Sequence, residues 1–161
     1  MSNLLPLIYD QFKLIVSELT IDKESKTYGA CSFKLNEKII IYRSAKTTPT
    51  KIGQFVTIWK RNEQGITAPF DIGDNFDFII INCEYGDLAG QFIFPKSVLL
   101  DKKIISGSKS SGKRGIRVYP VWDKTLNNQA QKTQQWQLDY FVDFSDEAEA
   151  TLSLFKKLIT I

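Results

Sequence analysis

The sequence predicts a single α/β (α+β) domain, in which a mixed or parallel β-sheet is flanked by an N-terminal helix and C-terminal helices. Three observations carry this prediction. Apolar residues recur at helical spacing near both ends of the chain, and several strand-like segments lie between them. Residues 76–83 (FDFIIINC) are apolar almost throughout and β-branched at their centre, which is typical of a central strand buried on both faces.

The bulk composition fits one soluble domain over residues 1–161. The chain is 43% hydrophobic and 24% charged, and no apolar run approaches the ~20 residues needed to span a bilayer. The apolar residues 4–19 include Asp10, Lys13 and Glu18, so they make a poor signal-peptide core. We therefore expect a cytoplasmic protein with no membrane association.

The first half of the chain predicts a helix followed by strands. Residues 4–19 are amphipathic at helical period, with Pro6 in the first turn, where its missing N–H costs nothing. Residues 28–35 and 38–45 read as strands joined by a short turn at Asn36 and Glu37. Pro49 interrupts the pattern, residues 53–60 form a further strand, and Gly- and Pro-punctuated residues 62–73 form a loop.

The second half predicts two more strands after the central one, and then helices. Residues 90–95 are strand-like, residues 97–102 a short helical turn, and residues 116–121 a strand. Residues 129–144 favour a helix, although 136–140 also alternate. Asp146 with Glu149 resembles a capping box for a final helix whose buried stripe is Leu152, Phe155 and Ile159.

The absence of histidine excludes much of enzyme chemistry. The chain has no His, which removes Ser-His-Asp and Cys-His nucleophiles and the common His-containing zinc sites. Cys31 and Cys83 are far apart in sequence and form no CxxC pair, so we expect buried thiols. No cofactor and no metal are expected.

Charge is distributed unevenly along the chain. Residues 38–61 carry six cations and no acid, residues 62–101 seven acids and one cation, and residues 102–124 seven cations and one acid. The two basic segments could form one positive face, or the acidic segment could neutralise them, and sequence does not decide between these outcomes.

A set of cations, aromatics and polar side chains is the main functional candidate. The stretch SGSKSSGKRGIRVYPVWDK (106–124) combines a Ser/Gly-rich tip, interpreted as mobile, with cations suited to phosphate and rings suited to bases. The polar residues 129–136 (QAQKTQQW) follow. The candidate nucleic-acid-binding residues are Lys46, Lys51, Lys60, Arg61, Lys109, Lys113, Arg114, Arg117, Tyr119, Trp122, Gln135 and Trp136.

For any one tryptophan, a place in the core is the simpler interpretation. Alternation over residues 54–60 puts Phe55, Thr57 and Trp59 on one face, which predicts a buried Trp59 and an outward Lys60.

Two catalytic motifs are incomplete. A metal-dependent nuclease needs converging carboxylates and a lysine, but Asp77 and Glu84 are seven apart and point to opposite faces of a strand. The sequence Ser111-Gly112-Lys113 resembles part of a P-loop, yet Arg114 stands where Ser or Thr is required.

Four motifs together resemble the MepB family of small bacterial proteins: TPTKIGQFVTIWKR (48–61), GQFIFPK (90–96), SGKRGIRVYPVWD (111–123) and QAQKTQQWQLDYF (129–141). The resemblance covers roughly residues 28–144. It implies a PD-(D/E)XK endonuclease-like fold, which is a mixed β-sheet flanked by helices, and nucleic-acid binding without the nuclease active site. Asp77 could fill the first acid's place, but Phe94 stands where the second acid should precede Lys96.

The leading hypothesis is therefore a non-catalytic protein that binds nucleic acid, preferring RNA or single-stranded DNA because only unpaired bases stack on side chains. The alternatives are a metal-dependent nuclease using Asp77 and Lys96, and a regulatory module that binds a small anionic ligand or a partner protein. The oligomeric state is not predictable from the sequence.

Overall fold

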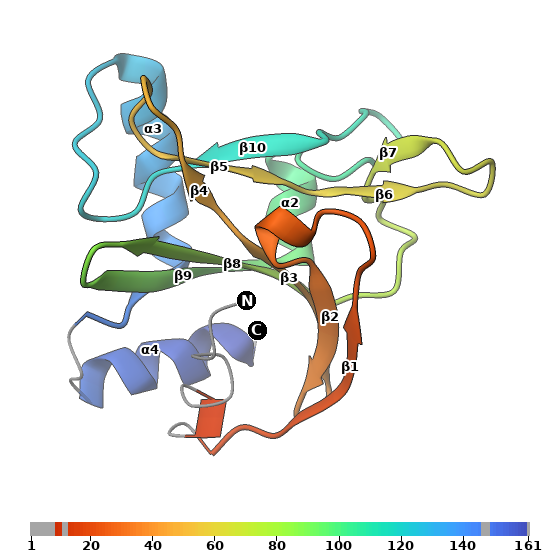
Figure 1. Ribbon diagram of the computed structural model, residues 1–161, viewed down its shortest axis with the longest axis horizontal. Helices are drawn as coiled ribbons and strands as arrows, with labels where there is room; N and C mark the ends of the chain where they lie inside the picture. The colour runs from red at the N-terminus through yellow and green to blue at the C-terminus, as the bar shows by residue number, and fades with distance from the viewer. Residues whose placement is uncertain (1–8, 11–12, 146–148, 161) are drawn as a thin grey trace.

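The computed structural model describes residues 9–10, 13–145 and 149–160, and its framework is a six-stranded mixed sheet (Figure 1). The strand order is β1-β2-β3-β8-β9-β11, with β3 and β8 parallel and every other pair antiparallel. The strands are β1 (Val16–Ile21), β2 (Cys31–Leu35), β3 (Lys38–Ser44), β8 (Phe78–Tyr85), β9 (Leu88–Pro95) and β11 (Phe141–Asp143).

Two smaller sheets and a few short helices complete the described chain. One small sheet has the order β10-β5-β4 and the other pairs β6 with β7. Their strands are β4 (Lys46–Thr47), β5 (Gln54–Thr57), β6 (Trp59–Arg61), β7 (Thr67–Pro69) and β10 (Gly115–Val118). The helices are η1 (Lys26–Tyr28), α2 (Lys96–Asp101), α3 (Asn128–Gln137), η2 (Leu138–Tyr140) and α4 (Glu149–Ile159). No helix in the described ranges has the length and apolar character that crossing a membrane demands.

The core lies on both faces of the main sheet, as the apolar sequence of β8 predicts. Alternate residues point to opposite faces of a strand, so Phe78 and Ile80 join one cluster while Ile79 and Ile81 join the other. All four side chains are at most 1% exposed. Burial on both faces explains why this strand has no polar alternation.

Different elements cover the two faces. One face packs against α4 through Phe155, Leu158 and Ile159. The other packs against the β10-β5-β4 sheet, through residues that include Val56 and Val118, and against α2 and α3. Figure 1 shows α4 below the main sheet and the small sheet with α3 above it. The candidate binding residues belong mainly to this second cover.

The predicted helix over residues 4–19 is wrong in its last part. Residues 16–21 form β1, which pairs with β2 (Val16↔Leu35, Ile21↔Cys31). Ile15 and Leu19, expected to be buried, are 70% and 51% exposed. Pairing with the edge of β2 overrides the helical periodicity of the segment. Tyr9 and Asp10 are helical, and the rest of residues 4–12 lies outside the described residues, as does Asp146 of the predicted capping box.

Two further predicted elements are divided in the structure. The strand over residues 53–60 separates into β5 and β6 at Ile58, whose N–H donates to the carbonyl of Arg114 (2.9 Å). The predicted alternation of this segment is confirmed, but its buried face is Gln54, Val56 and Ile58, which is the opposite face to the one predicted. Trp59, expected in the core, and Lys60, expected to point outward, are both half-buried. The helix over residues 129–144 ends at Gln137 and continues as η2 and β11, and the loop over residues 62–73 contains β7.

The remaining elements confirm the predicted mixed sheet flanked by helices. Strands β2, β3, β8, β9 and β10, the short helix α2 and the final helix α4 lie where the sequence placed them, within a few residues. The 28–35 strand starts late, at Cys31, because residues 26–28 form η1. Cys31 and Cys83 are free and buried, as expected. Burial raises the pKa of the Cys31 thiol to about 11.

Candidate nucleic-acid interface

The small sheet brings part of the two basic segments together. Phe55 of β5 is the register partner of Arg117 in β10 on one side and of Lys46 in β4 on the other. Directly paired residues share a face, so these three side chains lie on the outer face of the sheet. Val56 and Val118 alternate with them and pack into the core.

Beside this outer face lies an open hollow of about 550 Å³, here called the basic groove. It runs between the small sheet, the end of α2, the 113–119 segment and α3. The cations that line it are Lys51, Lys102, Lys113 and Arg117, and the aromatic rings are Phe55, Tyr119 and Trp136. The other lining residues are apolar or uncharged polar ones, with no carboxylate among the described residues that form the groove.

Close packing of the Ser/Gly-rich loop positions Lys113. The Gly112 N–H donates to Ser106 Oγ (2.7 Å), and the Lys113 N–H donates to the carbonyl of Ile104 (2.9 Å). A Cβ at Gly112 would lie 2.6 Å from the Ile104 carbonyl oxygen. The glycine at 112 is therefore required by a close backbone approach, which the Ser/Gly-rich composition of the segment does not reveal.

Arg114 and Arg117 donate hydrogen bonds to backbone carbonyls of neighbouring segments, and within the described residues neither forms an ion pair with a carboxylate. Arg117 Nη1 donates to the carbonyls of Ile52 (3.3 Å) and Gly53 (3.2 Å). Arg114 donates through Nε and Nη2 to the carbonyl of Thr67 (3.3 and 3.0 Å), so its guanidinium is directed toward β7. Arg117 lines the basic groove and Arg114 does not.

Two glutamines of α3 hold the far wall of the groove. The buried Gln137 accepts from the Tyr119 N–H (2.9 Å) and donates to the Arg117 carbonyl (3.1 Å). Gln134 Nε2 donates to the carbonyls of Pro120 (3.0 Å) and Asp123 (2.8 Å). Two of the five glutamines in residues 129–137 thus clamp β10 and the segment that follows it.

Trp136 occupies the junction between this clamp and the groove. Its ring packs on Phe94 (centroids 5.5 Å apart), and Lys102 Nζ lies 5.3 Å from the ring centroid. The side chain is half-buried and lines the groove. Lys102 was not among the predicted site residues. The sequence feature that could have identified it is the pair of lysines, Lys102 and Lys103, at the end of a short helix.

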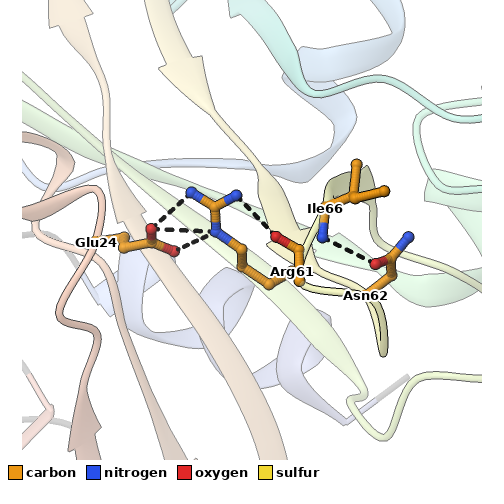
Figure 2. A network of polar contacts seen from close by, with 5 residues as sticks. Glu24, Arg61, Asn62 and Ile66 are labelled. Atoms are coloured by element: carbon orange, nitrogen blue, oxygen red, sulfur yellow. Dashed lines mark hydrogen bonds and ion pairs between the residues drawn. The ribbon is translucent and has the colours of Figure 1, made fainter.

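Two cations of the first basic segment (38–61), Lys60 and Arg61, are neutralised by acids. Lys60 Nζ lies 2.6 Å from Asp74 Oδ1. Figure 2 shows Arg61 held by Glu24, with 2.8 Å between Nη2 and Oε1. Arg61 Nη1 also donates to the carbonyl of Gly65, and Arg61 does not line the basic groove. The hydrogen bond from Arg61 is the main reason why the pKa of Glu24 is lowered. Arg61 also lies over the Trp59 ring, 5.4 Å from its centroid.

The remaining predicted residues surround the groove or lie apart from it. Lys46 Nζ is 5.2 Å from the centroid of the Tyr28 ring, and Lys109 is exposed on the loop. Trp122 packs edge-to-face on Phe141 (5.6 Å), facing the core. Gln135 lies on α3 beside a neighbouring hollow that shares Lys102 and Trp136 with the basic groove.

The residues of the nuclease alternative have other contacts. The Asp77 carboxylate accepts from the Ile39 N–H (2.8 Å), and Phe94 is fully buried in the core. Lys96 Nζ donates to the Asp74 carbonyl and lies 4.7 Å from the centroid of the Phe76 ring. Within residues 9–10, 13–145 and 149–160, no three His, Cys, Asp or Glu side chains are grouped so that they could hold a metal ion.

Comparison with known proteins identifies a family. The chain matches the MepB-like family model over residues 22–143. The solved structure described as "Crystal Structure of MepB" is 34% identical with a TM-score of 0.80, covering 91% of this chain and 99% of that chain. A bacterial homing endonuclease, I-Ssp6803I, is 13% identical with a TM-score of 0.45, covering 83% and 84%, a likeness too weak to carry an argument. No curated protein matches.

Proposed function

The chain belongs to the MepB-like family, and we propose that it binds nucleic acid in the basic groove without cleaving it. The observation that carries this proposal is the composition of the groove: Lys51, Lys102, Lys113 and Arg117 line one hollow that has no carboxylate among its described lining residues. Within the described residues Lys51, Lys113 and Arg117 form no ion pair, whereas Lys102 lies 4.0 Å from Asp101. Cations without a close carboxylate in a concave surface attract phosphate and release its counterions when they bind it.

The aromatic lining favours single strands. Tyr119 and Trp136 border the same hollow as the four cations, so a ring and a phosphate contact are available to one nucleotide. Stacking on an aromatic side chain requires an unpaired base, and each stacked base contributes about 1–3 kcal/mol. Lys132 is the single cation on α3, which gives this helix no basic stripe for reading a major groove. RNA or single-stranded DNA is therefore the proposed ligand.

Binding without cleavage is supported by the side chains at the nuclease-like positions. Phe94, which occupies the place of the second acid, packs against Phe92 (5.4 Å) and Trp136 (5.5 Å) inside the core. A carboxylate there would be desolvated among aromatic rings rather than offered to a metal. Asp77 accepts a backbone N–H that joins it to β3.

Fluorescence anisotropy with labelled single-stranded RNA, single-stranded DNA and duplex DNA at two salt concentrations tests the proposal. We expect the single strands to bind more tightly than the duplex, with affinity that falls as salt rises. Four phosphate contacts to a single strand give a slope of log K against log salt of about −2.8. Absence of binding, or affinity independent of salt, would contradict the proposal. Cleavage of the RNA with Mg²⁺ or Mn²⁺ that Asp77→Ala abolishes would establish the nuclease alternative.

A charge-matched pair of variants locates the site. Lys51→Ala with Lys113→Ala removes two groove cations, whereas Lys156→Ala with Lys157→Ala removes two exposed cations from α4, which covers the opposite face of the main sheet. Both variants change the net charge by the same amount. The first should bind the single strands at least about tenfold more weakly, and the second should bind within about twofold of the unmodified chain.

A further inference from the structure

A second hollow, of about 550 Å³, lies beside β3 and β6 and shares no lining residue with the basic groove. Its most unusual component is Arg43, a charged side chain that is only 3% exposed. The guanidinium lies 5.8 Å from the centroid of the Phe70 ring. We refer to this hollow as the Arg43 pocket.

Only one corner of the Arg43 guanidinium has a protein partner. Nη1 donates to the Tyr42 carbonyl (2.8 Å) and lies 3.4 Å from Asp22 Oδ2. Nε is buried and has no hydrogen-bond partner, and no acceptor for Nη2 is found among the described residues. Buried donors are nearly always satisfied in native proteins, so an unpartnered one indicates a missing acceptor such as water or an ion.

The Nε and Nη2 edge offers a defined chemistry. Its two N–H groups are parallel and coplanar, which matches the two oxygens of a carboxylate or a phosphate. An oxyanion in this position would supply the missing acceptors and offset the charge of a buried cation. The aromatic rings of Trp59 and Phe70 also line the pocket and could contact an apolar body attached to the anion.

The ion pair of Figure 2 lies at this pocket. Glu24 and Arg61 both line it, and the Glu24 carboxylate occupies Arg61 Nε and Nη2 through contacts of 2.8–3.2 Å. Of the two arginines in the pocket, Arg61 thus has a carboxylate on its Nε–Nη2 edge, whereas the same edge of Arg43 has none. An incoming anion would compete with Glu24 for Arg61 and be repelled by it.

We propose that the Arg43 pocket binds a small organic oxyanion, a carboxylate or phosphate on a compact apolar body, with the Nε–Nη2 edge of Arg43 as its anchor. Three of the four lining cations are paired: Arg43 with Asp22, Lys60 with Asp74 and Arg61 with Glu24. Lys23 forms no ion pair within the described residues and leaves the pocket an excess of one positive charge, which favours an anion. This site is independent of the nucleic-acid groove, because no residue is common to both.

Nitrogen-15 NMR of the arginine side chains tests the proposal directly, since the chain has four arginines and therefore four Nε–H signals to assign. The probes are benzoate, phenyl phosphate and neutral benzamide, each titrated at constant ionic strength. We expect a saturable shift of the Arg43 Nε–H signal with benzoate or phenyl phosphate and none with benzamide. The tighter of the two anions identifies the oxyanion. An Arg43 signal that neither anion shifts would overturn the proposal, as would an equal response to benzamide.

Variants give a second measurement. Arg43→Lys loses the two-pronged edge and should bind the anion at least about tenfold more weakly. If it fails to fold, Glu24→Gln carries the test: freeing Arg61 and removing a negative charge should tighten binding about fivefold. The matched control is Glu63→Gln, on the exposed β6–β7 turn and outside the pocket, which should leave affinity unchanged. Equal affinities of these two variants, or full affinity of a folded Arg43→Lys, would refute the site.

Discussion

The basic segments 38–61 and 102–124 have the same net charge in sequence, +6, and very different surroundings in the structure. In the first, Arg43, Lys60 and Arg61 each pair with an acid: Asp22, Asp74 and Glu24 respectively. In the second, Lys102 lies 4.0 Å from Asp101, and none of the other six cations forms an ion pair within the described residues. The two segments therefore have equal net charge but differ in how many of their cations are paired with an acid.

The difference follows from topology. The acids that neutralise the first segment come from the β1–η1 loop and from the turn before β8, both far away in sequence. Because β5 pairs with β10, Lys51, which precedes β5, lies near Lys113 and Arg117 rather than near these acids. One lysine of the first segment therefore joins the second, and the basic groove draws on both.

The largest expected effect concerns the clamp that supports the second segment. Gln137→Leu removes the partners of the Tyr119 N–H and the Arg117 carbonyl while leaving both in a partly buried site. We expect the free energy of unfolding to fall by about 2–4 kcal/mol, measured by chemical denaturation. Gln135→Leu, on the exposed side of the same helix, is the control and should change it by less than about 0.5 kcal/mol. Similar losses for both variants would show that no clamp exists.

The sequence predicts the central strand, its burial on both faces and three of the four groove cations, Lys51, Lys113 and Arg117, because these follow from local patterns such as the apolar run of β8. It does not predict which cations are free. That property depends on Glu24 and Asp74 meeting Arg61 and Lys60 through the fold, and no local pattern encodes those contacts. The last part of the predicted helix over residues 4–19 is wrong for a related reason: pairing with β2 decides the conformation of residues 16–21.

A smaller effect should come from Asp123, the one acid of the second segment. Burial raises its pKa above the ordinary 3.8, and Oδ2 is buried without a partner. Between 3.8 and the raised value the folded state binds more protons than the unfolded state, so stability falls as pH rises through that window. Asp123→Asn should therefore raise the Tm at pH 7 by roughly 1–2 °C and leave it unchanged near pH 3.

Thermal unfolding at the two pH values measures this effect. Asp87→Asn, on the exposed β8–β9 turn, makes the same change of charge and is the control. A Tm that rises equally for both variants would assign the gain to net charge rather than to the burial of Asp123.

The smallest expected effect tests the neutralised segment. The pKa of Glu24 is lowered from 4.5, mainly by the hydrogen bond from Arg61, so the stability that this pair contributes is present above pH 4.5 and is lost as pH falls through the lowered pKa. Glu24→Gln should lower the Tm at pH 7 by about a degree or less. The difference from the unmodified chain should vanish in acid. A difference that persists below pH 3 would show that Glu24 acts through packing.

The central claim is that the cations of the basic groove, and not the total charge of the basic segments, bind nucleic acid. The most direct measurement compares Lys51→Ala with Lys113→Ala against Lys60→Ala with Arg61→Ala, by anisotropy on the same single-stranded RNA across a salt series. Both double variants remove two positive charges. We expect Lys51→Ala with Lys113→Ala to bind at least about tenfold more weakly and to reduce the magnitude of the slope of log K against log salt by about 1.4. Lys60→Ala with Arg61→Ala, which removes cations already paired with acids, should bind within about twofold of the unmodified chain. Equal losses would contradict the account.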